Sequence, residues 1–206
     1  MGFRLPTSPK GWYLLLFNVA SFAGWASILF SASAHLASSD LDYQGLYSII
    51  GDRLAFVQSL AALEVLHVMV GWVRSSLMTT AMQVASRYFL VWGVLYLFPY
   101  PEVRQSVWFG LMVYAWSLAE IIRYSFYALK ELGLSPYPLV WARYTLFYVL
   151  YPLGVSGELV VTWHSLGYAR EWKKWYYQLL ILIMLNYAPG FVNMYSYMIK
   201  QRKKVL

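Results

Sequence analysis

Two side chains capable of proton transfer lie close together in one apolar stretch of the chain. Glu158 follows Tyr151 by seven residues, which is about 700° of helical rotation, so both would lie on one helix face about 10.5 Å apart along the axis. A carboxylate and a phenol can accept and donate a proton, so the pair predicts general acid–base chemistry. A kink at Pro152 would shorten the gap between them. The alternative interpretation is a proline kink beside an incidental tyrosine.

Further charged residues lie within other apolar stretches. Together with Glu158 they make three acids and three bases: Glu64, Arg87, Glu120, Arg123, Arg143 and Glu158. An isolated charge at the centre of a bilayer costs ~2.5–3.5 kcal/mol on insertion scales, so such residues normally face the protein interior and pair. We therefore expect a polar interior, open to one side of the membrane, that takes a lipid-like substrate with an anionic head. The alternative is that these residues only form interhelical ion pairs.

The composition indicates which elements must position these residues. Hydrophobic residues make up 60% of the 206 residues and charged residues 12%, about half the ~25% of an ordinary soluble domain. This balance excludes a disordered chain and favours one polytopic membrane domain over residues 1–206. The high share of apolar residues also argues against a soluble core, because too little polar surface remains to cover one.

Six stretches are long and apolar enough to cross a bilayer as helices, which takes about 20 residues each. They cover residues 12–30, 54–73, 81–98, 106–129, 139–162 and 175–199. The predicted fold is all-α, a six-transmembrane helix bundle. The longest gap between stretches is expected over residues 31–53, and the turns at 98–102 and 133–138 are short and rich in proline.

The distribution of basic residues predicts the orientation of this bundle. Six spans place both termini on one side, which carries more Lys and Arg than the other and is therefore expected to be cytosolic. Lys203 and Lys204 stand fourth and third from the end, as in a dilysine signal for retrieval to the endoplasmic reticulum; the alternative is a basic flank of the last span. A rival interpretation of the first span is a signal peptide cleaved after Ala34.

Several classes of site are excluded by composition. The chain has no cysteine, which excludes disulfides, thiolate metal sites and cysteine nucleophiles. Its three histidines, His35, His67 and His164, are far apart in sequence and form no metal-binding motif. The net charge of +7 is explained by bases beside a membrane, so no nucleic acid partner is expected.

The spacing of residues in the fifth span resembles that of the very-long-chain (3R)-3-hydroxyacyl-CoA dehydratases, also called protein-tyrosine-phosphatase-like proteins. The matching motif is Arg143-Tyr144, then Tyr151-Pro152-Leu153-Gly154, then Glu158. Glu64 to His67, Gln83 to Arg87 and Glu120 to Tyr124 resemble the motifs of the second, third and fourth spans. The resemblance covers spans two to six in order. Its phosphatase name does not extend to this chain, which lacks the nucleophilic cysteine.

The resemblance implies the third step of fatty-acid elongation, in which a (3R)-3-hydroxyacyl-CoA loses water to give a trans-2-enoyl-CoA. It implies Tyr151 and Glu158 as the catalytic pair, with no cofactor. Supporting or substrate-binding roles would fall to Gly154 and to the charged residues of the spans: Glu64, Arg87, Glu120, Arg123 and Arg143. We expect Glu158 to remove the C2 proton and Tyr151 to protonate the leaving hydroxyl, although the reverse assignment or a relay between the two would also fit.

The implied partners are the acyl-CoA substrate, the lipid bilayer and the other elongation enzymes, namely the elongase, the ketoacyl-CoA reductase and the enoyl-CoA reductase. The CoA phosphates would lie near the cytosolic mouth, where Lys10, Arg74 and Lys130 are candidates. Two alternatives are a non-catalytic scaffold of the elongation machinery and an ion-coupled transporter. A scaffold need not retain both Tyr151 and Glu158, and a transporter favours inverted repeats, which the sequence does not show.

Overall fold

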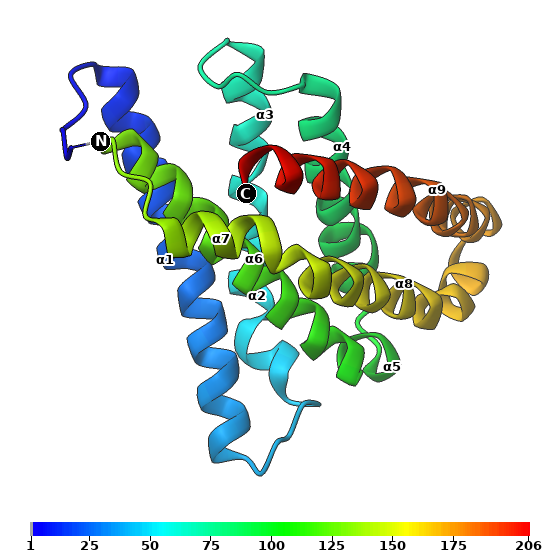
Figure 1. Cartoon of the computed structure of the whole chain (residues 1–206). Coiled ribbons are helices and arrows are strands. Elements are labelled where there is room, and N and C mark those ends of the chain that lie inside the picture. Colours follow the sequence, from blue (N-terminus) through cyan, green and yellow to red (C-terminus); the bar gives the residue numbers. More distant parts are fainter. Residues whose placement is uncertain (1) are drawn as a thin grey trace.

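The computed structural model describes residues 2–206, and the chain is helical with no strand in that range (Figure 1). The all-α class is therefore confirmed. The first half of the chain forms α1 (Pro9–Ser38), α2 (Leu46–Leu60), α3 (Ala62–Met69), α4 (Leu77–Tyr88), the π-helix η1 (Phe89–Tyr96) and α5 (Pro101–Arg104). The second half forms α6 (Val107–Glu131), α7 (Tyr137–Thr145), α8 (Phe147–Trp172) and α9 (Lys174–Val205).

The helix ends follow local sequence signals. Ser8 and Ser106 precede α1 and α6, and their hydroxyls accept hydrogen bonds from the backbone N–H groups of Gly11 and Trp108 at 3.2 Å. Such caps satisfy N–H groups that the first turn of a helix leaves unpaired. After α6 the chain turns at Gly133, whose φ of +74° is a conformation that favours glycine.

The first two helices extend beyond the apolar stretches, so the expected gap over residues 31–53 is wrong. The connection is only residues 39–45, because α1 continues to Ser38 and α2 begins at Leu46. Helical hydrogen bonds do not require apolar side chains, and polar helix ends were therefore missed. The connection is held by Asp42, whose carboxylate accepts the N–H of Gln44 at 3.0 Å.

Three of the six predicted spans are each made of two helical segments, and the third of these, 139–162, is divided into α7 and α8. The stretch 54–73 contains the end of α2, a break at Ala61, and α3. The stretch 81–98 begins as α4 and widens into η1, where Tyr176 of α9 donates to the carbonyl of Gly93 at 2.7 Å. This contact ties the beginning of α9 to η1.

Two helices, α1 and α9, are long and apolar enough to cross a membrane on their own. The pair α7 and α8, joined at a bend of 44°, would make a third span. α9 exposes large apolar side chains such as Leu182, Leu185 and Val192, which is the surface expected of a helix that faces lipid.

The bend in the fifth predicted span lies at Leu146, between α7 and α8, rather than at Pro152. Pro152 lacks an N–H, so it cannot bond to the carbonyl of Tyr148 four residues earlier. That carbonyl instead accepts the hydroxyl of Tyr195 from α9 at 3.4 Å. α8 runs without interruption from Tyr151 to Glu158, and their spacing on the helix is therefore not shortened by a break.

The core is organised around α6, which packs between α1 and α8. Its buried side chains include Phe109, Met112 and Trp116. From the other side, α1 contributes Trp25 and Ile28, which are almost fully buried. α6 is therefore the central element from which neighbouring helices position their polar side chains.

Candidate active site

Four of the six charged side chains from the predicted spans form one cluster between three helices. Glu64 lies on α3, Arg87 at the end of α4, and Glu120 and Arg123 on α6. Arg123 donates to both carboxylate oxygens of Glu64, at 2.6 and 2.7 Å, and from Nε to Glu120 at 2.7 Å. Arg87 pairs with the other oxygen of Glu120. The charges of the two acids and two bases cancel, which offsets part of the desolvation cost of burying them inside the protein.

The cluster reaches α8 through Trp116, which lies one turn before Glu120 on α6. The Arg87 guanidinium lies 5.4 Å from the centre of the Trp116 ring, and the indole N–H donates to Oε1 of Glu158 at 2.9 Å. The ion cluster therefore supports the side chain that holds Glu158, although it does not pair with Glu158 directly.

Glu158 is buried, with 7% of its surface exposed, and it is held by neutral donors. Its second oxygen, Oε2, accepts the hydroxyl of Tyr187 from α9 at 2.8 Å. Within residues 2–206 it takes part in no ion pair. Each carboxylate oxygen can accept more than one hydrogen bond, so Glu158 keeps the capacity to accept a proton while its orientation is fixed.

Tyr151 is half-buried on α8 and stacks against Phe191 of α9, with ring centres 5.2 Å apart and planes 14° apart. Its hydroxyl makes no hydrogen bond to the part of the chain that the structure describes. A free phenol O–H and a fixed carboxylate thus lie seven residues apart on one helix, and this arrangement can donate one proton and accept another.

Two of the other predicted site residues lie differently. Arg143 on α7 stays apart from the ion cluster: its guanidinium lies 4.7 Å from the ring centres of Phe126 and Tyr127 and donates to the Tyr127 hydroxyl at 2.9 Å. Gly154 is buried against Trp116.

The candidates for binding the CoA phosphates are Lys10, Arg74 and Lys130, and all three are exposed.

The two glycines of α8 differ in how closely α6 approaches them. A Cβ at Gly157 would lie 2.6 Å from Met112 Cβ and 2.9 Å from the Trp108 carbonyl, whereas a Cβ at Gly154 would meet nothing closer than 3.5 Å. We expect Gly157→Ala to lower the free energy of unfolding by about 1–3 kcal/mol through overpacking, and Gly154→Ala to leave it nearly unchanged. Thermal unfolding of the two purified variants checks this, and equal destabilisation by both would contradict it.

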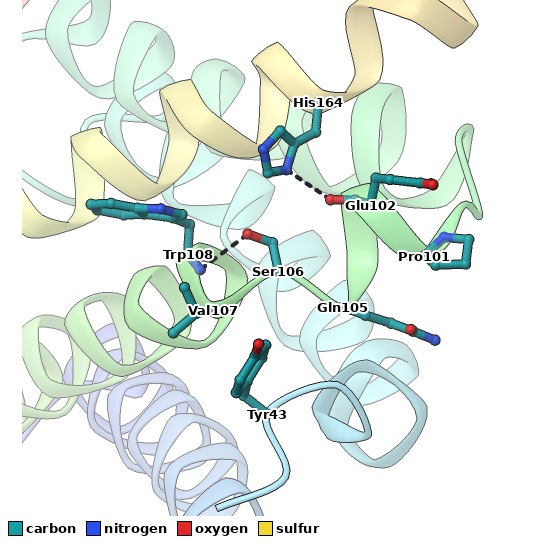
Figure 2. Close-up of a pocket in the computed structure, with 8 residues that line it drawn as sticks. All are labelled: Tyr43, Pro101, Glu102, Gln105, Ser106, Val107, Trp108 and His164. Carbon is teal, nitrogen blue, oxygen red and sulfur yellow. Dashed lines mark hydrogen bonds between the residues drawn. The ribbon is translucent and has the colours of Figure 1, made fainter.

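A cavity of about 440 Å³ lies elsewhere, between α5, the start of α6 and α8 (Figure 2). It is lined by Trp108 and His164 among others and contains neither Tyr151 nor Glu158. At its edge, His164 Nδ1 lies 2.7 Å from the Glu102 carbonyl, and the Glu102 carboxylate accepts the Tyr168 hydroxyl. That hydrogen bond lowers the pKa of Glu102 below its usual range. These contacts fix α5 onto α8.

Comparison with known proteins adds a second line of evidence. The family model described as protein tyrosine phosphatase-like protein, PTPLA, matches residues 58–206. The very-long-chain (3R)-3-hydroxyacyl-CoA dehydratase hpo-8 of Caenorhabditis elegans is 45% identical, over 94% of both chains. Dehydratase 2 of Homo sapiens is 43% identical, over 94% of this chain and 80% of its own length. The chain belongs to this dehydratase family.

The similarity to the dehydratase family extends to plants. PASTICCINO 2 of Arabidopsis thaliana, also named a very-long-chain (3R)-3-hydroxyacyl-CoA dehydratase, is 38% identical over 94% of this chain and 92% of its own length. No solved structure matches the chain. The resemblance seen in the motifs of spans two to six is therefore confirmed over most of the sequence.

The structure adds three polar side chains to the site, none of which had a role assigned from the sequence, although Tyr124 belongs to the fourth-span motif. Trp116 and Tyr187 contact Glu158, and Tyr124 donates to Glu64. Trp116 precedes Glu120 by four residues and Tyr124 follows it by four, so one face of α6 carries all three. That spacing was a usable signal, whereas Tyr187 depends on how α9 packs against α8.

Proposed function

We propose that this dehydratase acts through Glu158 as the base and Tyr151 as the acid. One observation carries the proposal. The buried Glu158 carboxylate is fixed by two neutral donors from α6 and α9, and Glu158 lies on the same helix as Tyr151, whose hydroxyl is free. The protein is a hydro-lyase that converts a (3R)-3-hydroxyacyl-CoA into a trans-2-enoyl-CoA and water, as the curated relatives are named.

The proposed reaction balances with these two residues alone. The Glu158 carboxylate takes the proton from C2 of the substrate, and the electron pair of that C–H bond forms the C2–C3 double bond. The C3–O bond breaks, and the departing hydroxyl takes the proton of the Tyr151 hydroxyl and leaves as water. Glu158 then loses its proton to water and the Tyr151 phenolate takes one from water, which restores the starting state. General acid and general base each contribute about 10²–10⁴-fold to such reactions.

We assign the remaining charged residues to support and to the CoA group. Arg87 and Arg123 are each bound to carboxylates. The role of Arg87 is to hold Trp116 and through it Glu158, and the role of Arg123 is to hold Glu120, the partner of Arg87. Arg143 carries no ion pair within residues 2–206, so its charge is available to the thioester end of the substrate. Lys10, Arg74 and Lys130 would meet the CoA phosphates.

We further propose that the chain crosses the membrane six times, as α1, α2 with α3, α4 with η1, α6, α7 with α8, and α9. The N-terminal segment supports this arrangement, because the Arg4 N–H donates to the Leu132 carbonyl in the turn after α6 at 3.0 Å. Six spans place the N-terminus and that turn on one side. The N-terminus, the α3–α4 connection and the C-terminus all lie in the upper half of Figure 1.

The side that holds both termini is assigned to the cytosol because of its excess of Lys and Arg. The proposed location is the membrane of the endoplasmic reticulum. There the elongase, the ketoacyl-CoA reductase and the enoyl-CoA reductase of the elongation cycle are the proposed partners.

Dehydration by the purified full chain tests the proposal. The chain in proteoliposomes is supplied with (3R)-3-hydroxypalmitoyl-CoA or its (3S) isomer, and trans-2-enoyl-CoA is measured by mass spectrometry. We expect product from the (3R) isomer only, and none from a Tyr151→Phe, Glu158→Gln double variant at equal protein. A correctly folded wild type that forms no product would contradict the proposal and favour a non-catalytic scaffold.

A further inference from the structure

One face of α9 carries three aromatic residues that lie against the candidate site on α8. Tyr187, Phe191 and Tyr195 are four residues apart and therefore share a face of the helix. In the same order, they contact Glu158, Tyr151 and Tyr148 of the antiparallel helix α8. We call this face, residues 187, 191 and 195, the aromatic stripe of α9. It touches both groups of the proposed pair, Glu158 through a hydrogen bond and Tyr151 through ring stacking.

Tyr187 completes a clamp on the Glu158 carboxylate. Trp116 of α6 donates to Oε1 at 2.9 Å, and Tyr187 of α9 donates to Oε2 at 2.8 Å. With one donor on each oxygen, from two different helices, rotation of the carboxylate group about its terminal bond is restricted. Loss of either donor would leave one oxygen free and the orientation of the base poorly defined.

The stripe also holds the acid. The Tyr151 ring lies nearly parallel to that of Phe191, and Tyr195 stacks further along with planes 20° from Tyr151 and 14° from Phe191. The stack leaves the Tyr151 hydroxyl without a hydrogen bond inside residues 2–206 while the ring is fixed. One face of α9 therefore determines how the donor and the acceptor of protons are oriented relative to each other.

The other polar contacts of this part of α9 come from Arg202, whose guanidinium donates to Thr145 of α7 at 3.4 Å and lies 5.9 Å from the centre of the Tyr148 ring. The buried residues of α9 are Tyr176 and Leu180, both in its first two turns, and Pro189 interrupts the hydrogen bonding of the helix beyond them. The aromatic stripe therefore provides the main polar and stacking contacts between the C-terminal half of α9 and α8. Its residues are not explained by general core packing.

We propose that Tyr187 is a positioning residue of the dehydration reaction, which holds the Glu158 carboxylate from α9 while Phe191 of the same stripe holds the Tyr151 ring. The inference rests on the proposed function of Tyr151 and Glu158. It extends the site to the last helix, none of whose residues was a candidate from the sequence.

The test compares Tyr187→Phe with Tyr197→Phe in the full chain in proteoliposomes, with (3R)-3-hydroxypalmitoyl-CoA as substrate. Tyr197 lies on the same helix with 54% of its surface exposed, so its variant is a matched control. Hydrogen bonds to charged groups are worth about 1.5–3 kcal/mol, which corresponds to about 10–100-fold in rate. We expect Tyr187→Phe to lower kcat by that factor with KM changed less than about 2-fold, and Tyr197→Phe to change neither.

Two further measurements make the result decisive. Phe191→Leu should also lower kcat at constant KM, and the thermal unfolding midpoint of Tyr187→Phe should stay close to that of the wild type, because the ring remains. Wild-type kcat in Tyr187→Phe, or a fall in kcat that only follows a loss of folded protein, would overturn the inference while an active wild type upholds the proposed function. A wild type without activity would instead overturn both.

Discussion

Glu158→Gln is expected to lower kcat for dehydration by at least about 10²-fold, because the amide cannot accept the C2 proton. The substitution keeps the size of the side chain, and its amide oxygen can still accept the Trp116 N–H while its NH2 donates to the Tyr187 hydroxyl oxygen. The measurement is the initial rate of enoyl-CoA formation by the purified chain at saturating substrate. Glu171→Gln, at an exposed position near the end of the same helix, is the matched control and should retain full activity.

Tyr151→Phe is expected to cause a comparable loss of dehydration, and hydrogen exchange distinguishes the two roles. If Glu158 is the base, Tyr151→Phe still exchanges the C2 hydrogen of the substrate with deuterated water, whereas Glu158→Gln does not. The exchange is followed by mass spectrometry of the unreacted substrate. The opposite pattern would show that the roles are reversed, and full activity in either variant would remove that residue from the proposed pair.

The second large effect is expected from Arg123→Met, which removes the centre of the buried ion cluster. Arg123 binds both oxygens of Glu64 and one of Glu120, and Glu120 is only 3% exposed. Removal of one member of a buried ion pair leaves an uncompensated charge and typically costs about 3–5 kcal/mol. We expect a corresponding fall in the free energy of unfolding, measured by denaturation of the purified protein in detergent.

Two variants control for charge and shape. Arg170→Met removes a base from an exposed position on α8 and should change the free energy of unfolding by less than about 1 kcal/mol. Arg123→Lys keeps the charge but cannot form the two-pronged contact with Glu64, so its stability should fall between those of the wild type and Arg123→Met. Equal stability of Arg123→Met and Arg170→Met would show that the cluster contributes nothing to folding.

The sequence predicted the helical class because apolar stretches of membrane length have few other solutions. It also predicted Tyr151 and Glu158 as a pair, since residues on one helix have a spacing that is independent of tertiary structure. The ends of the helices were harder to predict from the sequence. Residues 31–38 are polar enough to resemble a connection, and residues 46–53 form an apolar run too short to span a membrane that ends in Asp52 and Arg53, yet the backbone hydrogen bonds of both segments are helical.

Contacts between helices were only partly predictable. The charges of the spans had to pair because of their cost in an apolar interior, and the three-residue spacing of Glu120 and Arg123 indicated that these two share a helix face. No spacing showed that Arg123 would also bind Glu64 or that Arg143 would stay apart. Tyr187 was missed for the same reason. Its hydroxyl matters only because α9 packs antiparallel to α8 in one register, and that register depends on stacked aromatic rings far apart in sequence.

The packing of α1 against α6 constrains how the protein can be made. Trp25 and Ile28 are completed as a core only when α6 has been synthesised, about 90 residues after the end of α1. At translation rates of about 5–20 residues per second, α1 remains without its main partner, α6, for roughly 5–20 s. During that interval the face of α1 that later packs against α6 is exposed to lipid or to the insertion machinery. Assembly of the bundle is therefore a late event of biosynthesis, and a ribosome stalled before α6 would leave α1 packed against α2 but without its central partner.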